Sequence, residues 1–293
     1  MFLFLKRILE MIRFSHTIFA LPFALLSAVL AWCETEFRTI DLVGIILCLG
    51  CARSAAMGFN RVVDRNLDKL NPRTAFRHLP AGTLTVAAVI VFTLLCSFGF
   101  ISSTLLFKVR EPSNPWPLYL SAPVLLFIFL YSFTKRFTIL AHFWLGLALM
   151  LAPISAWIAI IGLEQLRTPF ILGLAVFFWV SGFDIIYACQ DAEFDRRVRL
   201  ASIPARFGVA WSLRLASCCH IAMFVMLLLL AVQLPALGTV YLVGLSAIGL
   251  LLIYEHSLVR PDDLSRVNQA FFQVNGVISV GLLLLVLVQL AVK

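Results

Sequence analysis

Two segments of the chain share an acidic pattern: two aspartates stand four residues apart, and a polar residue precedes them by four. The six positions are Asn60, Asp64, Asp68, Tyr187, Asp191 and Asp195. On a helix, residues at this spacing lie on one face, one turn apart. Like charges so placed repel each other, so a purely structural helix gains nothing from them, whereas a hard cation such as Mg²⁺ prefers oxygen ligands. The two pairs therefore predict a magnesium site, with Mg²⁺ as the cofactor.

Basic residues accompany the acidic pattern and could bind phosphate oxygens. Arginine offers a planar set of donors to a phosphate, and lysine offers a compact ammonium group. The candidates are Arg73, Arg77, Lys135 and Arg206. Carboxylates that hold Mg²⁺ beside basic side chains predict a diphosphate site. The chain contains no G-x-x-x-x-G-K segment, which argues against nucleotide hydrolysis.

Two further ionisable residues lie inside apolar stretches, where such groups are rare and usually face an internal cavity. Arg53 precedes Asn60 by seven residues, about two helical turns, and so lies on nearly the same face. It could bind an acceptor carboxylate, help to hold a diphosphate, or pair with an acid for structural reasons. Asp184 is the second of these residues. His16 and His142 fit core or interfacial histidines better than catalysts.

The composition requires a lipid environment. Of the 293 residues, 62% are hydrophobic and 13% are charged, about half the charged fraction of an ordinary soluble domain. A membrane-spanning helix needs about 20 apolar residues. We predict an all-α, polytopic membrane protein with about nine transmembrane helices in one domain, residues 1–293. The predicted spans are residues 14–33, 39–59, 83–107, 117–134, 137–162, 168–189, 211–232, 235–254 and 270–291.

The basic residues set the predicted orientation. Alternate connections between the spans hold most of the Lys and Arg residues, and the opposite side receives only Arg38, Lys108, Arg110, Arg167 and Lys293. The positive-inside rule then places the N-terminus and both aspartate-rich loops in the cytoplasm, where a helix bundle could face them across a shared cavity. This distribution explains the net charge of +8 without nucleic acid. No cleavage site or transit peptide is evident, so a bacterial inner membrane is the simplest location.

Four segments together resemble the UbiA-type family of membrane aromatic prenyltransferases. They are N-x-x-x-D-x-x-x-D at 60–68, R-T-x-x-R-x-L-P-x-G at 73–82, Tyr131-Ser-Phe-Thr-Lys135-Arg136, and D-x-x-Y-x-x-x-D-x-x-x-D at 184–195. The 4-hydroxybenzoate polyprenyltransferase branch is the most similar. The resemblance implies a UbiA-like helix bundle with cytoplasmic cap loops. One departure is Asn60-Arg61, where many relatives have Asn-Asp.

The resemblance also implies a reaction. A polyprenyl group would pass from polyprenyl diphosphate to the ring carbon ortho to the hydroxyl of 4-hydroxybenzoate, with release of diphosphate, in ubiquinone or menaquinone biosynthesis. The segment from Asp184 to Asp191, with Ser202-Ile-Pro-Ala-Arg206, also resembles relatives in futalosine-type menaquinone synthesis. Their acceptor is a dihydroxynaphthoate, so 1,4-dihydroxy-6-naphthoate stays open as an alternative.

The resemblance further implies residue roles. The metal ligands would be Asn60, Asp64, Asp68, Asp191 and Asp195. Substrate binding would involve Asn60, Arg73, Arg77, Tyr131, Lys135, Arg136, Tyr187 and Arg206. The catalytic candidates are Asp64, Asp191 and Arg53, and Asp191 is the first choice to assist deprotonation of the acceptor. The expected partners are the two substrates and the lipid bilayer, with no nucleic acid and no obligate protein partner.

Two rival functions remain open. One is a transporter for magnesium or an organic anion, although transporters usually place ion-binding acids near the bilayer midplane, not at the cytoplasmic ends of helices. The other is prenyl transfer to haem, chlorophyllide or a quinone precursor.

Overall fold

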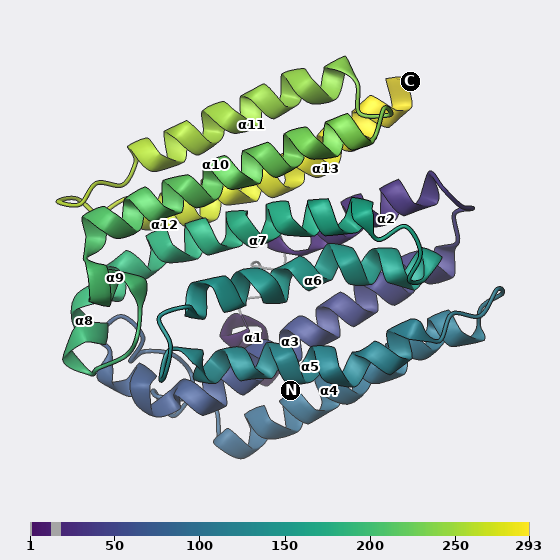
Figure 1. Cartoon of the computed structure of the whole chain (residues 1–293). Coiled ribbons are helices and arrows are strands. Elements are labelled where there is room, and N and C mark those ends of the chain that lie inside the picture. Colours follow the sequence, from purple (N-terminus) through teal and green to yellow (C-terminus); the bar gives the residue numbers. More distant parts are fainter. Residues whose placement is uncertain (1, 13–18, 293) are drawn as a thin grey trace. The chain divides into compact units, whose positions relative to one another are not determined.

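The computed structural model describes residues 2–12 and 19–292, and this part of the chain is built from helices (Figure 1). Contacts divide the chain into two compact units. Unit 1 contains the described residues of 1–17 and 37–133, and unit 2 contains those of 18–36 and 134–293. The division does not test the prediction of a single domain, which stays a prediction.

The helical, membrane-spanning architecture is confirmed. Among the described residues, eight helical segments are long and apolar enough to cross a membrane. Each corresponds to one of the predicted spans from the second to the ninth. The first predicted span, 14–33, matches the shorter apolar helix α2, Leu21–Trp32, and its residues 14–18 lie outside the described part. The predicted count of about nine is therefore close.

Unit 1 contains one short and three long helices. They are α1 (Phe2–Met11), α3 (Thr39–Leu70), α4 (Val86–Val109) and α5 (Trp116–Thr134, whose last residue falls in unit 2). Helices α3 and α4 pack along each other. The small residues Ala52 and Ala55 of α3 lie in a buried cluster with Phe100 of α4 and Leu125 of α5, and the rings of Phe59 and Phe129 stack 4.4 Å apart. Small residues let membrane helices approach closely.

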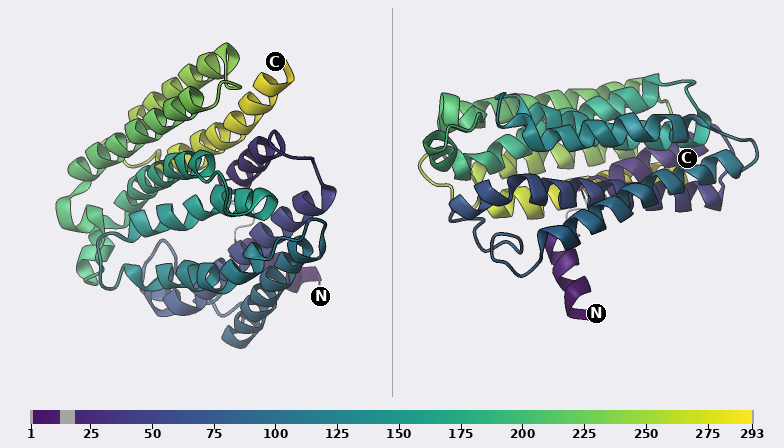
Figure 2. Two further views of the ribbon diagram at one scale, coloured as in Figure 1. Left: turned by 45° about the vertical axis from the view of Figure 1, so that its right-hand side comes forward. Right: turned by 90° about the horizontal axis from the view of Figure 1, so that it is seen from below.

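Unit 2 contains the remaining elements. They are α2, α6 (Ala141–Ile161), α7 (Arg167–Ala188), the 3₁₀ turn η2 (Cys189–Asp191), α8 (Ala192–Arg197), α9 (Ile203–Phe207), α10 (Val209–Gln233), α11 (Thr239–Ser257), α12 (Val267–Gln269), the π-helical turn η3 (Ala270–Val274) and α13 (Asn275–Val292). Helix α7 packs against α6 and α10, and α11 packs against α13. Figure 2 shows α10, α11 and α13 running side by side.

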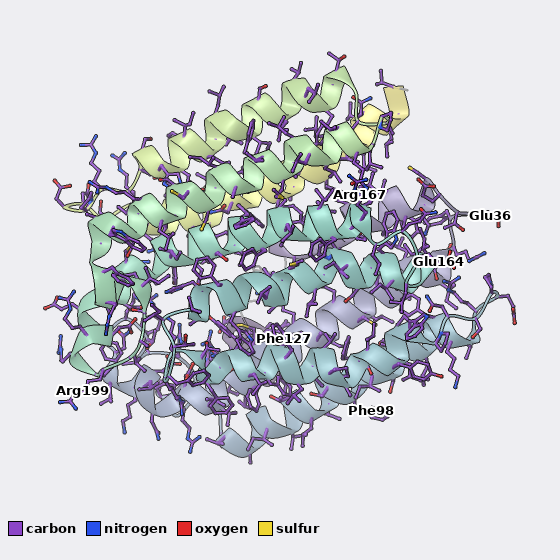
Figure 3. All side chains as sticks on the ribbon, in the orientation of Figure 1. Glu36, Phe98, Phe127, Glu164, Arg167 and Arg199 are labelled. Carbon is purple, nitrogen blue, oxygen red and sulfur yellow. The ribbon has the colours of Figure 1, made fainter. Side chains whose placement is uncertain are left out.

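Buried polar contacts fix the helices of unit 2 to one another. The indole nitrogen of Trp179 in α7 donates to Asn275 Oδ1 at 2.6 Å, and Asn275 Nδ2 donates to Glu255 Oε1 of α11 at 2.7 Å. Such hydrogen bonds hold helices together where lipid removes the hydrophobic drive for association. In unit 2, Arg199 lies at the opposite end of the helices from Glu164 and Arg167 (Figure 3). The aspartate-rich segment before Arg199 therefore lies at that same end.

Gly146 in α6 lets α7 approach closely, which gives a stability prediction. A Cβ at this position would lie 2.6 Å from the carbonyl oxygen of Phe177 and would also overlap Ser181 Oγ. Overpacking of this kind costs about 1–3 kcal/mol. We expect Gly146→Ala to lower the midpoint of thermal unfolding in detergent. Gly50→Ala in α3 is the matched control, since among the described residues no new neighbour lies within 4 Å of its added Cβ. Equal midpoints in the two variants would contradict the close approach.

Candidate functional site

The first acidic segment forms the end of α3. This helix contains 32 residues and is about 48 Å long at 1.5 Å per residue, longer than a hydrocarbon core of about 30 Å. It continues without interruption through Asn60, Asp64 and Asp68 to Leu70. The helix therefore extends eleven residues beyond the predicted span 39–59, and the three side chains keep their helical spacing.

Asp64 and Asp68 have different partners in unit 1. Asn60 Nδ2 donates to Asp64 Oδ2 at 2.8 Å and lies 3.5 Å from Ser132 Oγ of α5. Arg77 Nη1 donates to Asp68 Oδ1 at 2.7 Å. The second oxygen of Asp68, Oδ2, is buried and has no hydrogen-bond partner among the described residues. That oxygen is available as a ligand for a hard cation.

Arg61 belongs to the same cluster, although the sequence analysis gave it no role. Its side chain is buried, donates from Nη1 to Asn60 Oδ1 at 3.1 Å, and lies 3.9 Å from Asp68 Oδ2. The only signal in the sequence was the departure from Asn-Asp at this position. The basic residue therefore offsets the charge of the neighbouring carboxylates.

The loop after α3 is folded back onto the helix end. Thr74 Oγ1 donates to the carbonyl oxygen of Asp68 at 3.0 Å, and the backbone N–H of Arg73 donates to Asn71 Oδ1 at 2.9 Å. These bonds hold Arg73 and Arg77 near the acidic residues. Arg77 was predicted to bind phosphate, and the structure places it on Asp68.

The second acidic segment, in unit 2, has a different backbone from the first. Helix α7 ends at Ala188, the 3₁₀ turn η2 follows, and α8 begins after Asp191, whose φ and ψ are −100° and 2°. Asp191 and Asp195 are therefore not joined by one regular helix, in contrast to Asp64 and Asp68. Both side chains are nevertheless buried.

Asp195 is held by residues from two loops of unit 2. The Ser202 hydroxyl donates to its carboxylate, and Lys135, His142 and Asp191 lie within electrostatic range. The backbone N–H of Ala201 donates to the carbonyl oxygen of Lys135 at 2.8 Å, which ties the two loops together. Asp195 Oδ2 is buried and, within the described part of the chain, has no hydrogen-bond partner.

The other predicted residues are placed as follows. Arg53 lies partly buried in α3, and Tyr131 lies at the end of α5. Arg136 and Arg206 are exposed in unit 2. The ring of Tyr187 packs 4.3 Å from that of Phe271 in η3. A pair to which the sequence analysis gave no shared role also appears, since His142 Nδ1 lies 2.7 Å from Asp184 Oδ2.

The donor set of both segments fits magnesium. No group of three or more His, Cys, Asp and Glu side chains that could hold a metal ion occurs in the described ranges. Mg²⁺ does not require such a cage, because it usually takes one or two carboxylates and completes its shell with water and substrate phosphates. The buried oxygens of Asp68 and Asp195 that have no hydrogen-bond partner among the described residues are suitable ligands.

Comparison with known proteins places this chain among prenyltransferases. Residues 20–277 match the model of the UbiA prenyltransferase family. A 4-hydroxybenzoate octaprenyltransferase of Vibrio cholerae is 33% identical over 249 residues, covering 83% of this chain and 84% of the relative. The enzyme of the same name from Marinobacter nauticus is 32% identical over 235 residues, covering 79% and 76%.

Solved structures share the fold. The apo structure of a UbiA homolog from Aeropyrum pernix K1 has a TM-score of 0.79 and 26% identity, covering 94% of this chain and 97% of that one. A UbiA homolog from Archaeoglobus fulgidus bound to DMAPP and Mg²⁺ has a TM-score of 0.71 and 17% identity, covering 98% and 100%. With the family model matching most of its length, this chain belongs to the UbiA prenyltransferase family.

Proposed function

We propose that this protein transfers a polyprenyl group from polyprenyl diphosphate to the carbon ortho to the hydroxyl of 4-hydroxybenzoate, in ubiquinone or menaquinone biosynthesis. The observation that carries the proposal is the pair of carboxylate clusters at the ends of α3 and α7, each with one buried oxygen that has no hydrogen-bond partner among the described residues. Relatives named 4-hydroxybenzoate octaprenyltransferase, similar over most of the chain, support the choice of acceptor.

Each predicted residue has a role in this reaction. Asn60, Asp64, Asp68, Asp191 and Asp195 would hold Mg²⁺. When bound, the ion would neutralise charge on the diphosphate and so favour its departure from the prenyl carbon. Arg73, Arg77, Lys135, Arg136 and Arg206 would donate to phosphate oxygens. Arg53 would bind the acceptor carboxylate, while Tyr131 and Tyr187 would line the substrate site.

The charge distribution supports a location in a bacterial inner membrane, with the N-terminus and both acidic segments in the cytoplasm.

A second candidate acceptor is 1,4-dihydroxy-6-naphthoate, with the same chemistry. The resemblance of the segment from Asp184 to Asp191 to relatives in futalosine-type menaquinone synthesis favours it. Offering both acids to the purified protein distinguishes them: we expect faster turnover of 4-hydroxybenzoate. Faster turnover of the naphthoate would show that it is the acceptor, and the proposed type of reaction would stay the same.

Removal of one carboxylate from either cluster should stop the reaction. We expect Asp64→Asn and Asp191→Asn each to lower the rate of prenyl transfer at least about 100-fold, because charge stabilisation of a leaving group is worth that much. The measurement is formation of lipid-soluble product from radiolabelled 4-hydroxybenzoate by purified protein in detergent. Full activity of both variants would refute the proposed site.

Metal removal provides an independent test. We expect EDTA to abolish product formation and added Mg²⁺ to restore it. Ca²⁺ should restore less, because it favours longer bonds and more ligands than Mg²⁺. Transfer that continues in the presence of EDTA would contradict a role for the carboxylates as metal ligands.

The proposed orientation can be tested by cysteine labelling. Arg197 and Ser113 are both exposed and fall on opposite predicted sides of the membrane. In a variant without the native cysteines, we expect a membrane-impermeant thiol reagent added to intact cells to label Ser113→Cys and to leave Arg197→Cys unlabelled. The reverse pattern would invert the topology.

A further inference from the structure

Unit 2 contains a buried acid–imidazole pair that the predicted site does not use. His142, in the first turn of α6, places Nδ1 2.7 Å from Asp184 Oδ2 in α7. This short distance is typical of a charge-assisted hydrogen bond. Because the partner is a carboxylate, the hydrogen lies on Nδ1, and the pair links the two helices side by side.

The two members of the pair differ in exposure. His142 is fully buried, and its Nε2 has no hydrogen-bond partner among the described residues. The Asp184 side chain keeps 15% of its surface exposed. Within the described part, His142 is its one hydrogen-bond partner, and the bond uses Oδ2. Asp184 Oδ1 is therefore the atom that a ligand can reach, and His142 holds the carboxylate from the inner side.

The pair lies beside the acidic cluster of unit 2. Asp184 precedes Asp191 by seven residues along α7 and the turn η2. His142 lies within electrostatic range of Asp195. A carboxylate inside an apolar helix is costly, and it is usually retained where it serves a function. A purely structural role would require no exposed oxygen, whereas a role toward a substrate does.

Metal binding and proton transfer make different demands on a carboxylate, and this distinguishes Asp184 from Asp191. A carboxylate that holds a metal is a poor base, since metal ligands must stay deprotonated. The proposed function makes Asp191 a metal ligand, and the family resemblance also made it the first choice to accept the proton of the acceptor hydroxyl. Asp184 in α7 and Asp191 in the turn η2 can divide these tasks, as pairs of acids with different surroundings do in other enzymes.

We propose that Asp184 is the catalytic base that accepts the hydroxyl proton of the aromatic substrate, and that His142 is its positioning residue. This inference rests on the proposed function and deepens it. It applies to any acceptor with a phenolic hydroxyl, so it does not depend on whether the ring is a benzoate or a naphthoate.

Deprotonation of the hydroxyl makes the ring a nucleophile toward the prenyl carbon. The O–H bond of the acceptor breaks, and its proton goes to Asp184 Oδ1. The electron pair left on the oxygen moves through the ring, so that the ortho carbon forms a bond to the first carbon of the prenyl chain. The bond from that carbon to diphosphate breaks, and its electron pair leaves with diphosphate. The ring proton at the new bond then moves to the oxygen, and Asp184 returns its proton to water.

Asp184→Asn and Asp191→Asn test the division of tasks. Asparagine at 184 still accepts the bond from His142 Nδ1, so the fold is kept while the basic oxygen is lost. We expect Asp184→Asn to bind prenyl diphosphate with Mg²⁺ as tightly as the unchanged protein and to lower kcat for transfer about 100-fold or more, the usual contribution of a general base. Asp191→Asn should lose the Mg²⁺-dependent binding. Glu193→Gln, an exposed neighbour, is the control and should change neither.

Variants of His142 test positioning. The amide nitrogen of asparagine can replace Nδ1 as donor, and leucine cannot. We expect His142→Leu to lower kcat about 10-fold or more, as does loss of a residue that orients a functional side chain through a hydrogen bond. His142→Asn should have a kcat close to that of the unchanged protein. Equal kcat in both variants would overturn the positioning role.

A more acidic acceptor gives a readout that a structural role would not produce. A fluorine beside the hydroxyl favours its ionised form, so the base is needed less. With a fluorinated acceptor, we expect the loss of kcat in Asp184→Asn, relative to the unchanged protein, to become smaller. The loss of kcat in Asp191→Asn should stay the same. Transfer by Asp184→Asn at the unchanged rate would overturn this inference alone. Absence of transfer in the unchanged protein would instead overturn the proposed function.

Discussion

A carboxylate at the end of an apolar helix must be compensated, and much of the structure around the two acidic segments follows from this constraint. Burying an ionised acid without a partner costs several kcal/mol. In unit 1, Asp68 is compensated by Arg77 at 2.7 Å and by the more distant Arg61. In unit 2, Asp195 is compensated by the Ser202 hydroxyl and by Lys135. The loops that carry these partners fold against the helix ends because the partners must reach the carboxylates.

In both units, the buried carboxylates are only partly compensated by hydrogen bonds. Asp68 and Asp195 each keep one buried oxygen with no hydrogen-bond partner among the described residues, a deficit of about 1–3 kcal/mol per group. A protein selected only for stability would add one more donor at each position, and serine or arginine is already close by. Retention of such deficits is explained by a ligand that binds there. The incomplete compensation is thus the feature that joins the fold to the proposed chemistry.

The sequence predicted the helices and one of the two acidic segments well, because their signals are local. Length and hydropathy predicted the helical spans, and the spacing of four is consistent with the uninterrupted end of α3. The same spacing did not predict the 3₁₀ turn before Asp191, which packs against α9 and interrupts the regular helix. The pairing of His142 with Asp184 was missed because the two residues lie far apart in the sequence and only folding brings them together. Arg61 and Ser202 were missed although their partners are nearby in the sequence, because residue type and spacing alone do not show which neighbour a side chain contacts.

The position of Arg61 shows how a departure from a family pattern can be accommodated. The cluster in unit 1 contains Asp64 and Asp68 together with Arg61 and Arg77, so its formal charges cancel. A cluster of acids alone attracts a metal ion but repels a diphosphate. A balanced cluster accepts both together, because the charges of the ion and of the diphosphate nearly cancel as well. Arginine at this position therefore adds a positive charge beside Asp68, and it keeps Asn60 in place through the bond from Nη1 to Oδ1. A balanced cluster of this kind is compatible with the proposed site for a metal ion and a diphosphate, in which Asp64 and Asp68 remain the acidic ligands.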